Sequence, residues 1–128
     1  MLPSPVQFKH KLFYVGNDLD LMKSLQAALK GEGWLIVRCP GDSTVHVLLQ
    51  SQIHYDLLLF DENLPYTTWT ELVRSARRLE HRKRTPIILL LCKECEVKKP
   101  RGNVHQFLWQ PERLEELADT IRRMLALR

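Results

Sequence analysis

Two short runs of almost uninterrupted apolar residues constrain the fold of this chain more than any other feature. One is Asp-Leu-Leu-Leu-Phe-Asp over residues 56–61, and the other is Pro-Ile-Ile-Leu-Leu-Leu-Cys over residues 86–92. A strand that is buried on both faces has this pattern, because side chains on either side of the strand meet a covered face of the sheet. Such strands are typical of a parallel sheet with helices on both sides. We therefore predict an α/β domain.

Three further segments are predicted as strands, namely Lys11–Gly16, Trp34–Cys39 and, more weakly, His105–Trp109. Apolar residues recur at helical spacing between the strands: Leu21, Leu25, Ala28 and Leu29; Val45, Leu48 and Leu49; Leu72, Val73, Ala76 and Leu79; and, after Pro111, Leu114, Leu117, Ala118, Ile121 and Leu125. This alternation, with right-handed crossovers, predicts a single doubly wound parallel sheet of five strands.

One interval breaks the alternation. Between Cys92 and His105, Val97 is the only apolar aliphatic residue before Pro100. Proline and the nearby glycine disfavour a long helix, so we predict that the fourth helix is shortened or missing. The interval begins with a Cys-x-x-Cys pattern at Cys92 and Cys95, which lacks a second pair of zinc ligands; we interpret it as chance.

Length and composition favour one domain. The chain has 128 residues, of which 45% are hydrophobic. This is enough for one core, which we place in residues 10–128 after a disordered lead-in, residues 1–9. No apolar stretch reaches the length of a membrane span, and the first residues lack the features of a signal peptide. Three cysteines do not indicate a disulfide framework, so we expect a cytoplasmic protein.

Several side chains fall where predicted strands end, at the edge of the sheet where doubly wound proteins bind their ligands. These positions are Gly16, Asn17 and Asp18 after the first strand, Asp61 and Asn63 after the third, Leu91 near the end of the fourth, and Gln110 after the fifth. We expect them to lie close together, with Asp61 as the reactive carboxylate. A strand-end aspartate can also simply cap the following turn, and this structural role stays open.

Four segments at these positions resemble the receiver domain of bacterial two-component response regulators. They read FYVGND from Phe13, DLLLFDENLP from Asp56, TPIILLL from Thr85 and FLWQP from Phe107, and Asp-x-x-Leu-Pro from Asp61 is the most specific part. The resemblance covers nearly the whole chain. It implies a flavodoxin-like receiver fold with strand order 2-1-3-4-5 and a role in phosphorelay signal transduction.

The resemblance also implies roles for single residues. Asp61 matches the phosphoacceptor, and the backbone carbonyl of Asn63 matches a Mg²⁺ ligand. The family's acidic pair falls on Gly16 and Asn17, its hydroxyl residue on Leu91, its lysine on Gln110 and its switch aromatic on Phe107. Asn17, Asp18, Asp61 and Asn63 are therefore the candidate metal ligands, and Asn17, Asp18, Leu91 and Gln110 the candidate pocket.

The departures from the family pattern weaken this chemistry. Mg²⁺ prefers carboxylate oxygens, whereas Gly16 offers none and Asn17 offers a neutral amide. Asp18 is one residue late and is as well placed to cap the first helix. Leu91 cannot hydrogen-bond a phosphoryl oxygen, and Gln110 brings no charge. We expect weak Mg²⁺ binding at best and no other cofactor.

These observations favour a degenerate, or pseudo-, receiver that is not an enzyme and acts as a phosphorylation-independent protein-interaction module. Its partner would be a histidine kinase or a regulator output domain, and by resemblance the contact surface would include Phe107, Trp109 and Arg122. Trp69 and Trp109 could cover the pocket or simply pack at its rim. A first alternative is a working receiver that is phosphorylated on Asp61 by a histidine kinase and holds its metal weakly through Asn17 or Asp18.

A lower alternative is a basic module that binds nucleic acid. The net charge is +4, and much of the positive charge lies between Arg74 and Arg84, including Arg77 and Arg78. Nucleic-acid binding would favour interleaved aromatic residues or a recognition helix, and neither is visible. We therefore expect no nucleic-acid contact through this domain, and no insertion into a membrane.

Overall fold

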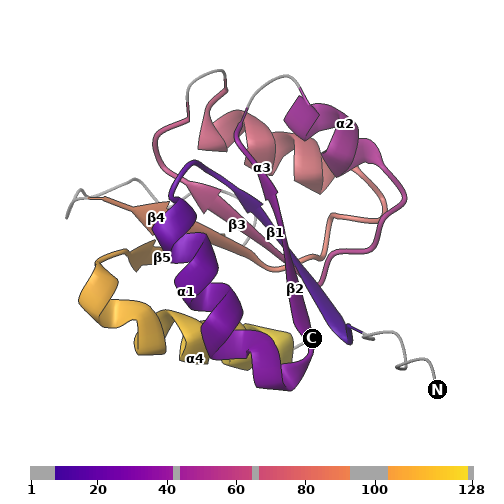
Figure 1. The fold of residues 1–128 in the computed structure, drawn as a ribbon. Coiled ribbons are helices and arrows are strands. Elements are labelled where there is room, and N and C mark those ends of the chain that lie inside the picture. The colour runs from indigo at the N-terminus through magenta and orange to yellow at the C-terminus, as the bar shows by residue number, and fades with distance from the viewer. Residues whose placement is uncertain (1–7, 42–43, 65–66, 93–103, 127–128) are drawn as a thin grey trace.

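The computed structural model describes residues 8–41, 44–64, 67–92 and 104–126, and shows a five-stranded parallel sheet between two layers of helices (Figure 1). The strands are ordered β2-β1-β3-β4-β5, as predicted. Their bounds are β1 His10–Val15, β2 Trp34–Cys39, β3 Leu57–Asp61, β4 Ile87–Leu91 and β5 Val104–Leu108. The predicted fold class is therefore confirmed.

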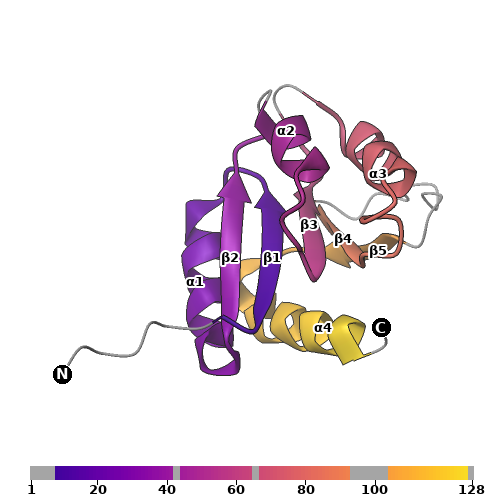
Figure 2. The same ribbon diagram turned by 90° about the vertical axis from the view of Figure 1, so that its right-hand side faces the viewer.

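Four α-helices occur in the described part of the chain, and they divide between the two faces of the sheet. Helices α1 and α4 cover one face, and α2 and α3 cover the other (Figures 1 and 2). Their bounds are α1 Leu19–Leu29, α2 Thr44–Gln50, α3 Trp69–Arg78 and α4 Leu114–Ala126, with 3-10 turns η1 at Lys30–Glu32 and η2 at Pro111–Arg113. The final helix thus begins with a 3-10 turn at Pro111, the residue at which it was predicted to open.

The central strands are buried along their length because every side chain meets a covered face. All five residues of β4 are buried, as are the first four of β3. β5 lies at the edge of the sheet and buries only Phe107 fully, which explains its weaker sequence signal. Asp56, which was predicted to begin the third strand, precedes it: its carboxylate accepts the Lys11 backbone N–H at 2.8 Å.

The helix starts follow the capping signals in the sequence. Asp18 is the N-cap of α1, and its side chain accepts the backbone N–H of Leu21 at 2.9 Å. Thr68 caps α3 in the same way, accepting the N–H of Glu71 at 3.2 Å. Each cap satisfies one of the N–H groups that the first turn of a helix leaves unbonded. Asp18 is thereby fixed at the edge of the sheet where the candidate site lies.

Part of the basic cluster between Arg74 and Arg84 is structural. Arg82 is only 1% exposed, donates hydrogen bonds to the carbonyls of Leu49 at 3.0 Å and Ser51 at 2.9 Å, and places its guanidinium 4.5 Å from the centre of the Tyr55 ring. Arg77 donates to two further backbone carbonyls, 2.9 and 3.1 Å away. Two of the arginines that suggested a nucleic-acid surface therefore bind the backbone at the end of α2 and in the segment that follows α3.

Some predictions concern residues that the structure does not describe. They include the shortened or missing helix predicted between Cys92 and His105, Cys95 itself, and residues 1–7 of the predicted lead-in. Lys9, at the end of that lead-in, donates its backbone N–H to the carbonyl of Gly33 at 2.8 Å and so joins the first strand to the start of the second. No helix within the described ranges is both long and apolar enough to cross a membrane.

Candidate functional site

The carboxyl ends of β3 and β4 open on a pocket of about 190 Å³, next to the turn that follows β1. It is lined by Asp18, Asp61, Glu62, Asn63, Leu90, Leu91, Cys92 and Trp109. The structure thus brings together Asp61, Asn63, Asp18 and Leu91, as the sequence predicts. Asn17 and Gln110 do not line the pocket, and both are exposed.

Asp61 is held by groups from β1 and the turn after it. The hydroxyl of Tyr14 donates a hydrogen bond to Asp61 Oδ2 at 2.8 Å, and the backbone N–H of Asn17 donates another. Burial raises the pKa of Asp61 to about 6, and these two hydrogen bonds offset only part of that effect. The carboxylate is therefore ionised at neutral pH at a cost in desolvation.

The hydroxyl of Tyr14 links Asp61 to the start of α1. It accepts the backbone N–H of Asp18 at 3.1 Å while it donates to Asp61. Burial, followed by the negative charge of Asp61, raises the pKa of Tyr14. The phenol therefore remains protonated and keeps its role as the donor.

Gly16 leaves the space that Asp61 and Tyr14 fill. A Cβ atom built on Gly16 would lie 2.1 Å from Asp61 Oδ2 and 2.5 Å from the Tyr14 hydroxyl oxygen. A side chain at this position is incompatible with the observed placement of those two groups. Gly16 therefore does more than remove a potential metal ligand. Its missing side chain leaves the space in which Asp61 and Tyr14 meet.

Arg38, near the end of β2, binds the turn after β1 from the other side. Its Nε donates to the carbonyl of Gly16 at 3.1 Å, and its Nη2 donates to the side-chain Oδ1 of Asn17 at 3.2 Å. The amide oxygen of Asn17, predicted as a weak metal ligand, therefore already binds a positively charged group. Sequence reasoning missed both Arg38 and Tyr14.

A separate set of contacts closes the side of the pocket formed after β3 and β4. Glu62 accepts the backbone N–H of Cys92 at 3.1 Å, and Asn63 Nδ2 donates to Cys92 Sγ at 3.1 Å. Burial, together with the hydrogen bond to Glu62, raises the pKa of the Cys92 thiol. Cys92 is thus an exposed, weakly acidic thiol that links the two strand ends, and its surroundings do not activate it as a nucleophile.

The two tryptophans have different roles. Trp109 lines the pocket, packs at the margin of the core shared by α1 and α4, and donates its backbone N–H to the carbonyl of Leu91 at 2.9 Å. Trp69 begins α3 and packs against the opposite core instead. Trp109 and Leu91 give the pocket an apolar wall where the receiver pattern has a hydroxyl group and a lysine nearby.

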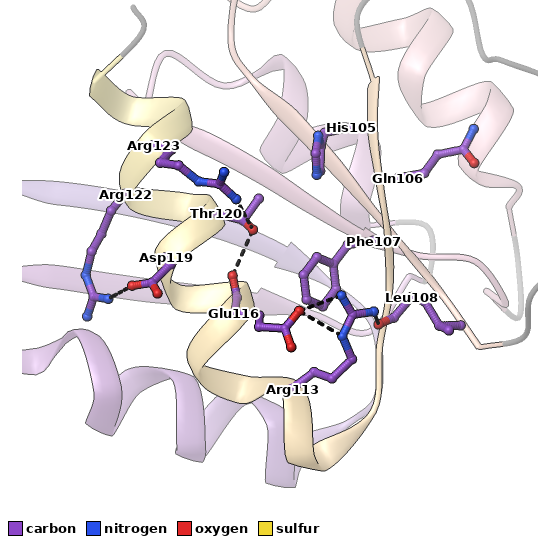
Figure 3. Close-up of a pocket in the computed structure, with 10 residues that line it drawn as sticks. All are labelled: His105, Gln106, Phe107, Leu108, Arg113, Glu116, Asp119, Thr120, Arg122 and Arg123. Atoms are coloured by element: carbon purple, nitrogen blue, oxygen red, sulfur yellow. Dashed lines mark hydrogen bonds and ion pairs between the residues drawn. The ribbon is translucent and has the colours of Figure 1, made fainter.

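Phe107, the predicted switch aromatic, belongs to a second and larger hollow between β5 and α4. This hollow has a volume of about 730 Å³, and Figure 3 shows the ten residues that line it. Phe107 is buried, and the guanidinium of Arg113 lies 4.5 Å from the centre of its ring. Arg113 also pairs with Glu116 at 2.7 Å, so the ring is covered by an ordered ion pair.

The residues present fit a Mg²⁺ ion poorly, because several of the candidate oxygens already accept hydrogen bonds. Asp61 Oδ2 is bound by Tyr14, Asn17 Oδ1 is bound by Arg38, and Asp18 Oδ1 is used as a helix cap. A hard divalent cation requires several oxygen ligands, preferably charged ones. Within the described ranges no group of three or more histidine, cysteine, aspartate or glutamate residues is arranged to hold a metal.

Comparison with known proteins supports the fold. No family model and no curated protein matches the chain. The structure is similar to the receiver domain of the sensor histidine kinase PA1611 from Pseudomonas aeruginosa, crystallised with a magnesium ion in its active-site cleft: 21% identity and a TM-score of 0.73 over 91% of this chain and 98% of that one.

Two further solved structures give the same result. The chemotaxis response regulator CheY4 of Vibrio cholerae is 23% identical, with a TM-score of 0.73 over 90% of this chain and 98% of that one. The phosphorylated cyanobacterial phytochrome response regulator RcpA is 19% identical, with a TM-score of 0.68 over 90% of each chain. The chain therefore has the receiver fold. At these identities the likeness establishes the fold alone.

Proposed function

We propose that this domain is a degenerate receiver, a protein-interaction module of two-component signalling that works without a phosphorylation switch and is not itself an enzyme. The observation that carries the proposal is the way Asp61 and Asn17 are held. Tyr14 binds the carboxylate of Asp61, and Arg38 binds the amide oxygen of Asn17. Phosphoryl transfer depends on a metal and on positioned charges, and here internal groups have taken those contacts.

The proposed partner is a histidine kinase or a regulator output domain in the cytoplasm. The hollow between β5 and α4 (Figure 3) supports this, because it offers a partner a shaped surface that shares no lining residue with the pocket at Asp61. Most of its charged groups are paired within the domain: Arg113 with Glu116, and Arg122 with both Asp119 and Glu32. Such pairs order the surface before binding, which lowers the cost of association.

The test is incubation of the whole chain with a small phosphodonor, such as phosphoramidate, and Mg²⁺, followed by intact-protein mass spectrometry. We expect no phosphoryl adduct under conditions that phosphorylate RcpA, which serves as the positive control. An adduct that disappears in Asp61→Asn would refute the proposal and establish the working receiver instead.

The working receiver is favoured by one observation. A pocket lies directly beside Asp61, and the carboxylate is accessible from it. A phosphodonor small enough to enter could reach the acid without the metal, although much more slowly. The time course of the same mass measurement, with and without Mg²⁺, distinguishes a metal-dependent receiver from slow chemical modification.

The nucleic-acid alternative predicts binding that weakens steeply with salt and with charge reversal at Arg77 and Arg78. Arg77 donates to backbone carbonyls, and this reduces the charge available on the surface. We expect no salt-sensitive binding to DNA or RNA in an anisotropy titration. Tight binding that Arg78→Glu abolishes would favour this alternative.

A further inference from the structure

We propose that Tyr14 and Arg38 act together to exclude divalent cations from the strand-end site, with the guanidinium of Arg38 serving as a permanent cation at the turn after β1. The two residues would then determine that this receiver fold is metal-free. The proposal concerns the metal alone and does not depend on whether Asp61 accepts a phosphoryl group.

The register of the sheet places the two side chains together. Tyr14 on β1 is the direct partner of Arg38 on β2, and paired residues of adjacent parallel strands point to the same face. That face is the one covered by α1 and α4, since Tyr14 belongs to the core formed with those helices. Both side chains reach the same turn, Tyr14 on the side of Asp61 and Arg38 on the side of Asn17.

Together the two residues bind three oxygens around the turn after β1, two of which belong to candidate metal ligands. Tyr14 donates to Asp61 Oδ2 at 2.8 Å, and Arg38 donates to the Gly16 carbonyl at 3.1 Å and to Asn17 Oδ1 at 3.2 Å. An N–H or O–H group that points at an oxygen takes one of its two lone-pair directions and so weakens it as a metal ligand. The fixed positive charge of Arg38 also repels a second cation at the amide oxygen it binds.

The space at Gly16 completes the arrangement. Asp61 and Tyr14 lie so close to Gly16 that a Cβ atom there would overlap both. Restoring a carboxylate at this position cannot create a metal site while Tyr14 holds Asp61 in place. The exclusion of metal therefore depends on Tyr14 and Arg38, and a missing acid at Gly16 accounts for only part of it.

Terbium luminescence tests this, because Tb³⁺ is a hard cation that seeks oxygen ligands and Trp109 lines the pocket as a built-in sensitiser. Tb³⁺ alone is titrated into the whole chain and into two variants. One carries Gly16→Asp, and the other carries Gly16→Asp with Tyr14→Leu and Arg38→Ala. We expect the triple variant to bind Tb³⁺ at least about tenfold more tightly than Gly16→Asp. In Gly16→Asp the cation must displace hydrogen bonds from Tyr14 and Arg38, and displacing one charge-assisted hydrogen bond costs enough for a tenfold difference.

A second comparison leaves Gly16 unchanged and so avoids the risk that its variants fail to fold. Tyr14→Phe combined with Arg38→Ala should take up Tb³⁺ more tightly than the unmodified chain, and Asp61→Asn should remove that gain. Arg78→Ala, on the exposed surface of α3, is matched in charge to Arg38→Ala and should leave Tb³⁺ binding unchanged.

The outcomes are distinct. Stoichiometric Tb³⁺ or Mn²⁺ binding by the unmodified chain, lost in Asp61→Asn, would overturn the proposal. Equal binding by Tyr14→Phe/Arg38→Ala and Arg78→Ala would also overturn it. Tighter binding confined to the variants that lack Tyr14 and Arg38 supports it, whatever the phosphodonor experiment shows.

Discussion

The raised pKa of Asp61 predicts that removing its charge stabilises the folded domain near neutral pH. The folded state holds the proton of Asp61 up to a pKa of about 6, against an ordinary value of 3.8 in the unfolded chain. Between these values the folded state binds more protons, so its stability falls as the pH rises through this window. Asp61→Asn has no such titration and should escape that loss.

The size of the effect follows from the difference in pKa. At about 1.4 kcal/mol per pH unit, the difference between about 6 and 3.8 corresponds to roughly 3 kcal/mol. The carboxylate is partly open to the pocket, and solvent screening reduces this to about 1–2 kcal/mol. A constant offset accompanies it, because the carboxamide has one acceptor atom in place of two.

Urea unfolding at a series of pH values measures this directly. The stability of Asp61→Asn relative to the unmodified chain should rise by about 1–2 kcal/mol between about pH 4 and pH 7.5. Glu115→Gln, at an exposed carboxylate of α4, is the control and should show no comparable rise. A relative stability that stays constant across the range, or that falls as the pH rises, would refute the reasoning.

Three further substitutions test contacts described above by the same unfolding measurement. Gly16→Ala should cost about 1–3 kcal/mol, because its Cβ meets Asp61; an equally stable variant would contradict that close approach. Arg82→Met should cost about 2–4 kcal/mol, because the carbonyls of Leu49 and Ser51 each lose a donor and Ser51 keeps only His81; a loss below 1 kcal/mol, roughly, would contradict the structural role of Arg82. Asp18→Ala should lower the free energy of unfolding by about 1 kcal/mol, because α1 loses its N-cap. The first turn of α1 should then fray before the other helices unfold.

The predictable part of the fold follows from local patterns. The central strands were placed to within a residue at each end, because Leu58 and Ile88 lie in runs that are apolar on both faces. The cap at Asp18 was one of two roles that its position in the sequence allowed, and the structure gives it that role. These features depend on a few neighbouring residues, so a single sequence carries enough information to find them.

The contacts that define the candidate site were beyond the sequence for a physical reason. Tyr14 and Arg38 are far apart in the chain and meet only through the register of β1 against β2. Alternation along β1 and β2 could have placed Tyr14 and Arg38 on one face of the sheet. The groups that each side chain binds depend on the register of the two strands, which the alternation does not give. The burial of Arg82 was missed for a related reason, since a cluster of basic residues is usually a solvated surface.

The close approach of Gly16 to Asp61 and Tyr14 also affects how such a sequence can change over generations. A carboxylate introduced at Gly16 meets space filled by Asp61 and Tyr14, so that substitution destabilises the fold while both residues keep their places. A change at Tyr14 alone leaves the N–H of Asp18 without its acceptor and brings no compensating ligand. Each of these two single steps therefore passes through a less stable protein. The arrangement therefore opposes the stepwise gain of an acid at this turn.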